Sequence, residues 1–138
     1  MVDGKAGHKS IVKFKQIFDT PIFTVIEMEY VKGGLLKKLF KRSEPLTERE
    51  ASTVVKNILE GVNHIHSLDY IHRDLKPENI MLTSRGSLDV KIVDFGLSVK
   101  HKGGPISLNN QLDDKVGTLI YMAPEQASYK SYSKVTSN

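Results

Sequence analysis

Two polar motifs in this sequence carry the side chains of a phosphate and metal site. Residues 72–79 read His-Arg-Asp-Leu-Lys-Pro-Glu-Asn, and residues 94–96 read Asp-Phe-Gly. The apolar runs between them would pair as two strands and bring the carboxylates of Asp74 and Asp94 close to the amide of Asn79. Hard oxygen ligands of this kind suit magnesium. The pattern therefore predicts a site that holds magnesium and a phosphate group beside a hydroxyl group.

Two further motifs follow along the chain, Gly-Thr at 117–118 and Ala-Pro-Glu at 123–125. Together with residues 72–79 and 94–96, they resemble the protein kinase family, and specifically its serine/threonine branch. A polar turn, a strand end and a loop could each produce one motif, but not all of them in this order. The resemblance implies that the γ-phosphate of ATP, held with Mg²⁺, is transferred to Ser/Thr hydroxyl groups of a protein substrate.

The resemblance also implies an α+β, protein-kinase-like fold, with residues 1–138 forming a partial domain. Residues 7–31 would supply two strands and the hinge of the small lobe. Residues 32–138 would supply the first half of the mainly helical large lobe, with the catalytic loop and activation segment, and would end before the central helix. The small-lobe part contains no glycine-rich phosphate loop, so nucleotide binding should be poor. Without the central helix, the apolar stripe of residues 51–65 would lack its main packing surface. We therefore expect the isolated chain to be marginally folded and catalytically inactive.

The family's catalytic roles fall on five residues of this chain. Asp74 would accept the proton of the substrate hydroxyl, and Lys76 would neutralise charge on the transferring phosphate. Asn79 and Asp94 would hold Mg²⁺. Thr118 resembles the threonine that contacts the base and the lysine, which favours Ser or Thr as the phosphate acceptor.

The nucleotide pocket is implied by residues on the second strand and near the catalytic loop. Met28 would guard the back of the pocket, the backbone of Glu29, Tyr30 and Val31 would hydrogen-bond adenine, and Met81 would form the floor. Taken singly, an apolar residue in a strand is usually an ordinary core residue.

Packing roles are implied for aromatic side chains beside the catalytic motifs. His72 and Phe95 would stack in a column that fixes the metal-binding motif, which Gly96 completes, and Phe14 would lie at the other end of that column. Glu125 would meet an arginine further along the family's chain.

Arg73 lies next to the predicted base, and a buried guanidinium in that place needs a further anion. We expect Asp114 to supply part of that negative charge, in the place where relatives carry a phosphorylated residue. The alternative is that Asp114 is a solvated loop acid.

Glu78 could attract a basic side chain of the substrate. Leu35, however, follows Gly33 and Gly34 where relatives often have an acid, which argues against a preference for basic substrates.

Local patterns predict the elements that must position these residues. Residues 11–18 alternate, with Phe14 and Phe18 on one face, and the turn at 19–21 predicts a hairpin with residues 22–30. A second hairpin is predicted for 80–83 and 90–93, and a loop for 101–115.

A long helix is predicted to begin at Thr47, because Glu50 completes a capping box with it. Behind this start an apolar stripe keeps helical spacing, comprising Ala51, Val54, Val55, Ile58, Leu59, Val62 and Ile65.

Bulk composition narrows the class of protein. The 138 residues are 39% hydrophobic and 26% charged, with a net charge of +4 and no cysteine, so disulfides and thiolate metal sites are excluded. Scattered basic residues without interleaved aromatics argue against nucleic-acid binding, and no apolar run is long enough for a membrane span. With no targeting signal, the cytoplasm or nucleus is the default location.

Two other functions compete with protein kinase activity. A non-catalytic kinase-like binding module would have no need for Asp74, Lys76, Asn79 and Asp94 together. A small-molecule phosphotransferase would need a base and metal ligands, but not Thr118 with the Ala-Pro-Glu motif.

Overall fold

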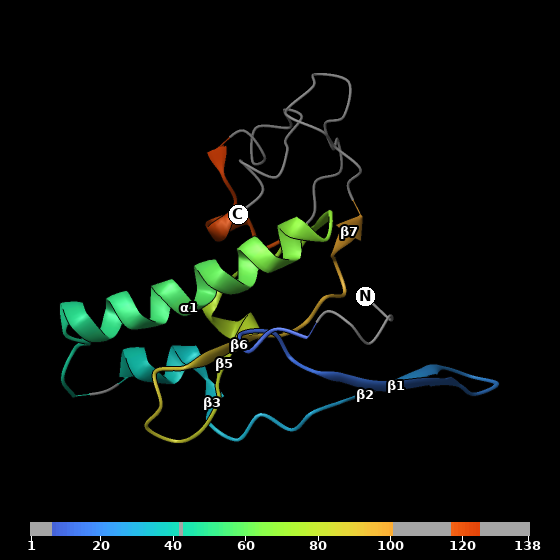
Figure 1. The fold of residues 1–138 in the computed structure, drawn as a ribbon, viewed down its shortest axis with the longest axis horizontal. Helices are drawn as coiled ribbons and strands as arrows, with labels where there is room; N and C mark the ends of the chain where they lie inside the picture. The colour runs from blue at the N-terminus through green and yellow to red at the C-terminus, as the bar shows by residue number, and fades with distance from the viewer. Residues whose placement is uncertain (1–6, 42, 101–116, 125–138) are drawn as a thin grey trace.

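The computed structural model describes residues 7–41, 43–100 and 117–124 (Figure 1). Within these residues one long helix, α1, crosses a small antiparallel sheet, and a separate hairpin extends to one side. This α+β arrangement agrees with the small-lobe strands and the start of the large lobe that the sequence predicts. No helix in the described ranges is long and apolar enough to cross a membrane.

The first predicted hairpin is present as β1 (Phe14–Asp19) and β2 (Thr24–Met28), which pair antiparallel. The prediction that Phe14 and Phe18 share a face is wrong. The register shifts between Phe14, opposite Met28, and Gln16, opposite Glu27, so β1 contains one extra residue. Because side chains alternate along a strand, this bulge moves Phe18 to the face opposite Phe14.

The second predicted hairpin is also present, as β5 (Ile80–Leu82) and β6 (Val90–Ile92). β5 pairs on its other edge with β3 (Gly34–Leu35), giving the order β3-β5-β6. The Gly33 amide donates to the Leu82 carbonyl at 3.0 Å, and a methyl group on Gly33 would overlap that same oxygen. Close backbone approach therefore explains the glycine at position 33.

Shorter elements complete the described chain. They are the 3₁₀ helices η1 (Leu36–Lys41), η2 (Pro77–Asn79) and η4 (Leu119–Tyr121), and the strands β4 (Tyr70–Ile71) and β7 (Val99–Lys100), which pair antiparallel. β4 lies directly before the 72–79 motif and β7 lies shortly after the 94–96 motif, so their pairing holds the start of one motif near the end of the other.

α1 (Glu48–Ser67) begins as predicted. The Thr47 hydroxyl accepts from the Glu50 amide at 3.3 Å, and the Glu50 carboxylate accepts from the Thr47 amide at 2.8 Å. This capping box satisfies amide groups that have no partner within the helix.

The apolar stripe of α1 packs against the sheet along one edge. Val54 and Ile65 are buried, whereas Val55 and Leu59 are 51% and 61% exposed. The helix comes close to β6 at Gly61, where a methyl group would lie 2.9 Å from Cδ1 of Ile92. Of the seven residues of the predicted stripe, Val55 and Leu59 are therefore the two that the described residues leave exposed.

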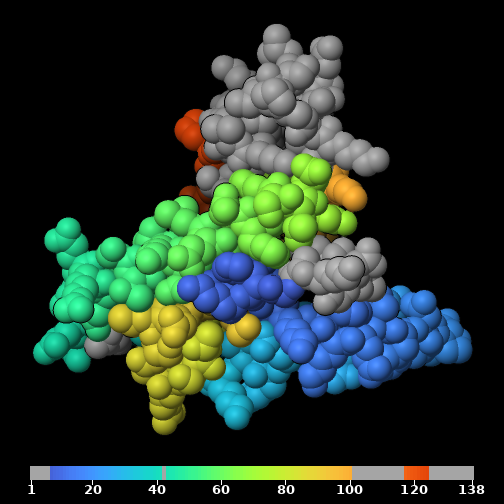
Figure 2. All heavy atoms as spheres, in the orientation of Figure 1, coloured from blue at the N-terminus to red at the C-terminus, as the bar shows by residue number. Residues whose placement is uncertain are grey.

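Segment 7–12 is the third layer around this contact. Figure 2 shows it (dark blue) lying along α1 (green). The Ile92 amide donates to the Ser10 carbonyl at 2.8 Å, the Val12 amide donates to the Ile92 carbonyl at 3.0 Å, and Ile11 forms a cluster with Ile65 and Ile92. Helix, sheet and N-terminal segment therefore share one apolar centre.

The Ile92→Ala substitution should lower the free energy of unfolding by about 2 to 5 kcal/mol, because it leaves a cavity at this centre. Ile26→Ala on the exposed hairpin is the matched control and should cost less than about 1 kcal/mol. Urea denaturation followed by circular dichroism measures both. Equal losses in the two variants would show that the core does not lie at β6.

Candidate active site

Strand pairing brings the two catalytic motifs together. The 72–79 motif runs directly into β5 through η2, and the 94–96 motif follows β6. Beyond the ends of these paired strands, the Val93 amide donates to the Asn79 carbonyl at 2.9 Å. Asn79 and Asp94 therefore start from adjacent backbone, as the sequence predicts.

The Asp74 carboxylate is the centre of the site. Its Oδ2 accepts from Lys76 Nζ at 2.7 Å and from Asn79 Nδ2 at 2.8 Å, and its Oδ1 accepts from the Thr118 hydroxyl at 2.8 Å. Lys76 Nζ also donates to Thr118 Oγ1 at 2.7 Å. Four of the predicted site residues thus form one connected network.

Electrostatics keep this carboxylate ionised. Its side chain is 9% exposed, and burial by itself raises the pKa of Asp74. The bonds from Lys76, Thr118 and Asn79 outweigh burial, so the pKa of Asp74 is lowered from its ordinary value. The same contact with Asp74 raises the pKa of Lys76. The pair is therefore an anion and a cation held together at neutral pH.

Asn79 and Asp94 have the chemistry that a magnesium ion needs. Asn79 Nδ2 donates to both the backbone and the carboxylate of Asp74, which orients the amide and leaves its Oδ1 as the possible ligand. Asp94 has φ of +59°, and its Oδ1 accepts from the Gly96 amide at 3.2 Å. Aspartate tolerates this left-handed backbone better than most residues. One amide and one carboxylate are few ligands, which fits a metal that also takes phosphate oxygens and water.

The described residues contain no cluster of three His, Cys, Asp or Glu side chains that could hold a metal by themselves. The predicted ligands do not form such a cluster, since one of them is an amide.

His72 is a buried structural residue. The Asp74 amide donates to His72 Nδ1 at 3.3 Å, so Nδ1 accepts and Nε2 carries the proton, which it gives to the Val93 carbonyl at 3.1 Å. Burial lowers the pKa of His72, although the Val93 carbonyl and nearby carboxylates oppose this. The neutral ring thus ties the catalytic loop to the end of β6.

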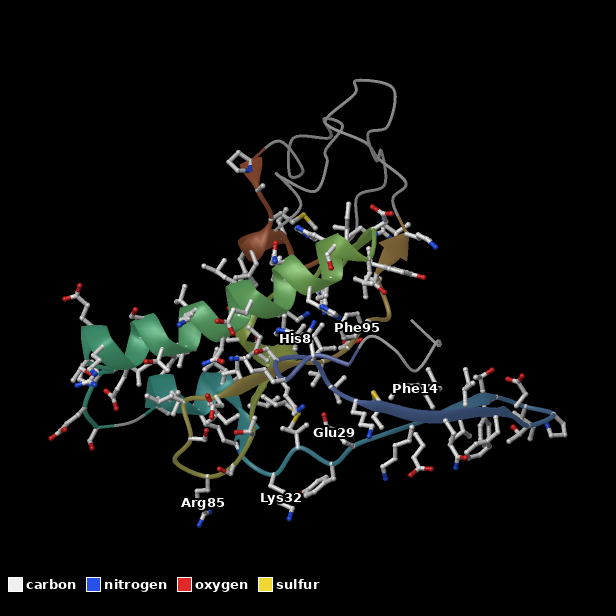
Figure 3. All side chains as sticks on the ribbon, in the orientation of Figure 1. His8, Phe14, Glu29, Lys32, Arg85 and Phe95 are labelled. Atoms are coloured by element: carbon white, nitrogen blue, oxygen red, sulfur yellow. The ribbon has the colours of Figure 1, made fainter. Side chains whose placement is uncertain are left out.

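The predicted aromatic column has two members in this structure. The rings of His72 and Phe95 meet edge to face, with centroids 4.9 Å apart. Figure 3 shows Phe95 near α1 and Phe14 on the hairpin, and within the described residues these two phenylalanine rings make no contact.

Arg73 has φ of +70° and donates through Nε to the Leu97 carbonyl at 2.7 Å. Gly117 lies against the Arg73 backbone with φ of +114°, and a methyl group there would overlap the Arg73 carbonyl oxygen. A glycine is therefore required where the chain returns to present Thr118. The predicted regulatory residues Asp114 and Glu125 lie outside the described residues.

The proposed adenine-binding residues differ in exposure. Val31 is buried, Met81 is partly buried, and Met28 and Tyr30 are 45% and 83% exposed. The Glu29 backbone amide donates to the Lys13 carbonyl at 2.9 Å, which ties this segment to the N-terminal side of the hairpin.

The Glu29 side chain makes a contact that sequence reasoning missed. Its Oε1 accepts from Lys91 Nζ at 2.7 Å and from the Lys13 amide at 2.7 Å. Burial raises the pKa of Glu29, but these two bonds outweigh it, so the pKa is lowered. The sequence indicates only which face Lys91 occupies. Side chains alternate along β6, so Lys91, between the buried Val90 and Ile92, lies on the face opposite to theirs.

Comparison with known proteins finds the same family that the sequence motifs resemble. A family model described as "Protein kinase domain" matches residues 2–137. The chain is 38% identical over 130 residues to Death-associated protein kinase dapk-1 of Caenorhabditis elegans, covering 94% of this chain and 9% of that protein. It is 38% identical over 131 residues to Myosin light chain kinase A of Dictyostelium discoideum, covering 94% and 43%.

A third relative is Serine/threonine-protein kinase 33 of Bos taurus, which is 34% identical over 134 residues, covering 92% of this chain and 27% of that protein. The chain thus spans less than half the length of each of these relatives.

Thr118→Val should raise the pKa of Asp74, because it removes one of the donors that favour the ionised carboxylate. Thr118→Ser keeps the hydroxyl and should leave the pKa close to that of the wild type. Titration of the Asp74 carboxyl carbon by ¹³C NMR measures both variants. Equal shifts in the two would show that the hydroxyl does not contact Asp74 in solution.

The pKa of His72 is lower in the folded chain than its ordinary value of 6.5. Just below pH 6.5 the unfolded chain therefore binds a proton at His72, whereas the folded chain leaves the ring neutral. The free energy of unfolding should therefore fall as the pH drops through 6.5 towards the lower folded pKa. His72→Gln should lose this part of the pH dependence. Ring ¹⁵N shifts should show the neutral Nε2–H form at pH 6.5, and a doubly protonated ring there would contradict the assignment.

Proposed function

The chain belongs to the protein kinase domain family, and from that premise we propose that the site around Asp74 transfers the γ-phosphate of ATP to Ser or Thr hydroxyl groups of a protein substrate. The observation that supports this best is the network of Lys76, Asn79 and Thr118 on the Asp74 carboxylate. The activity is proposed for the whole protein that carries this domain.

Asp74 serves the substrate hydroxyl. Its lowered pKa makes it a weak base, so it orients the hydroxyl oxygen towards phosphorus. It receives the hydroxyl proton as the new O–P bond forms and the bond from the γ-phosphorus to the departing ADP oxygen breaks. Phosphoryl transfer needs positioning and charge compensation more than covalent chemistry, and an ionised, rigidly held carboxylate meets that need.

Lys76 supplies positive charge at the same place. Its ammonium group is held by Asp74 and Thr118, so it is oriented before the substrate arrives. A fixed cation close to a transferring phosphate stabilises the negative charge without the cost of reorganising solvent.

Asn79 and Asp94 would hold Mg²⁺, which neutralises charge on the phosphates when it is bound with ATP. The backbone of Glu29, Tyr30 and Val31 would hydrogen-bond the adenine base, with Met28 behind it and Met81 beneath it. Because Glu29 uses its carboxylate on Lys91, its contribution to the nucleotide would come from the backbone alone.

Asp94→Asn should abolish the Mg²⁺-dependent part of ATP binding, because it removes the anionic ligand. Asp89→Asn on the β5–β6 turn is a matched control with an exposed acid and should leave that binding unchanged. Binding of a fluorescent ATP analogue to the whole protein that carries this domain is measured in Mg²⁺ and in EDTA.

Equal affinity of the whole wild-type protein in Mg²⁺ and in EDTA would contradict the proposal. Where the wild-type protein transfers phosphate to a serine peptide, Asp74→Asn should lower that rate by about 10²- to 10⁴-fold.

A further inference from the structure

Glu78 is placed to influence which substrate approaches Asp74. It lies in η2 between Lys76 and Asn79, and both of these neighbours bond to Asp74 through their side chains. Glu78 therefore lies in the same short segment as two residues that hold Asp74, beside the place where a substrate hydroxyl would be presented. A free carboxylate at this point would attract a basic side chain of the substrate.

The Glu78 carboxylate is already engaged within the chain. Lys37 Nζ of η1 lies 3.5 Å from Glu78 Oε1, and η1 and η2 are in contact. The second oxygen, Oε2, is shielded from solvent and has no hydrogen-bond partner in the described structure. One oxygen is thus neutralised by Lys37, and the other cannot be reached by an incoming cation without rearrangement.

The surface next to Glu78 carries positive charge. η1 reads Leu-Lys-Lys-Leu-Phe-Lys and contains no acid, and Leu35, directly before it, is also uncharged. Lys38 and Lys41 are exposed and lie three residues apart, which aligns them on one side of a 3₁₀ helix. By the same spacing Lys37, which pairs with Glu78, lies on a different side of η1 from Lys38 and Lys41, so Lys37 is the lysine of η1 that is placed beside the catalytic loop.

We propose that Lys37 is a specificity-determining residue: by pairing with Glu78 it excludes basic substrate side chains, and as the cation of that pair it favours a protein substrate with acidic side chains beside the acceptor hydroxyl. This inference rests on the proposed function, because it takes Asp74 as the point that the hydroxyl approaches. Lys37 and Glu78 are 43% and 39% exposed, so the preference is modest and weakens with salt.

The test uses three peptides with a central serine whose flanking positions carry Asp, Gln or Arg. Their affinities for the 138-residue chain are measured by NMR titration at low and at physiological salt. The wild type should bind the Asp peptide most tightly. Lys37→Gln should bind the Arg peptide about twofold to fivefold more tightly than the wild type does, and the Asp peptide correspondingly less tightly.

Two control variants separate this effect from a general loss of charge or of fold. Lys37→Arg keeps the positive charge and should keep the wild-type order of affinities. Lys15→Gln removes an equivalent exposed pair on the hairpin, where Lys15 Nζ lies 2.9 Å from Glu27 Oε1, and it should change none of the affinities. The amide spectrum of α1 reports whether each variant is folded.

The outcomes distinguish this inference from the proposed function. An unchanged ratio of Arg-peptide to Asp-peptide affinity in Lys37→Gln overturns the inference, as does failure of the chain to bind any of the peptides, even if Mg²⁺-dependent ATP binding is present. A ratio that shifts as expected supports it, and it does so even where the whole protein shows no Mg²⁺-dependent ATP binding, in which case only the proposed function fails.

Discussion

The ionised carboxylate of Asp74 is the constraint on which the site depends. Burying a charge is costly unless partners compensate it, and here the compensation comes from three directions along the chain. Lys76 and Asn79 are local, whereas Thr118 is 44 residues away and closes the site from the other side. Because each partner is also held by a second contact or by the strand that follows it, the carboxylate fixes the catalytic loop and the returning segment together.

Each element behind the Asp74 carboxylate has a separate task in holding the site. β5 and β6 deliver Asn79 and Asp94, α1 covers one face of the sheet, and the neutral ring of His72 joins the loop to the end of β6. Segment 7–12 completes the apolar centre from outside. A small sheet of this kind is stable only when something packs on it, so the site depends on α1 even though no residue of α1 enters it.

Local signals in the sequence were sufficient for several features. Thr47 with Glu50 marked the start of the helix, turn residues marked both hairpins, and the motifs predicted the contacts of Asp74 with Asn79 and Thr118. The prediction of which β1 side chains share a face was wrong, because the bulge near Phe14 arises only from pairing with β2. The Lys91–Glu29 and Lys37–Glu78 pairs were not predictable, since each joins residues that the fold, and no local pattern, brings together.

The backbone at Gly117 has a consequence of a different kind. Its left-handed φ and its contact with the Arg73 carbonyl leave no room for any side chain. In a saturation mutagenesis map of this domain, position 117 should therefore be as intolerant as the reactive residues, although it contributes no functional group. Intolerance at position 117 would reflect the close approach of two backbone segments and not a role in the reaction.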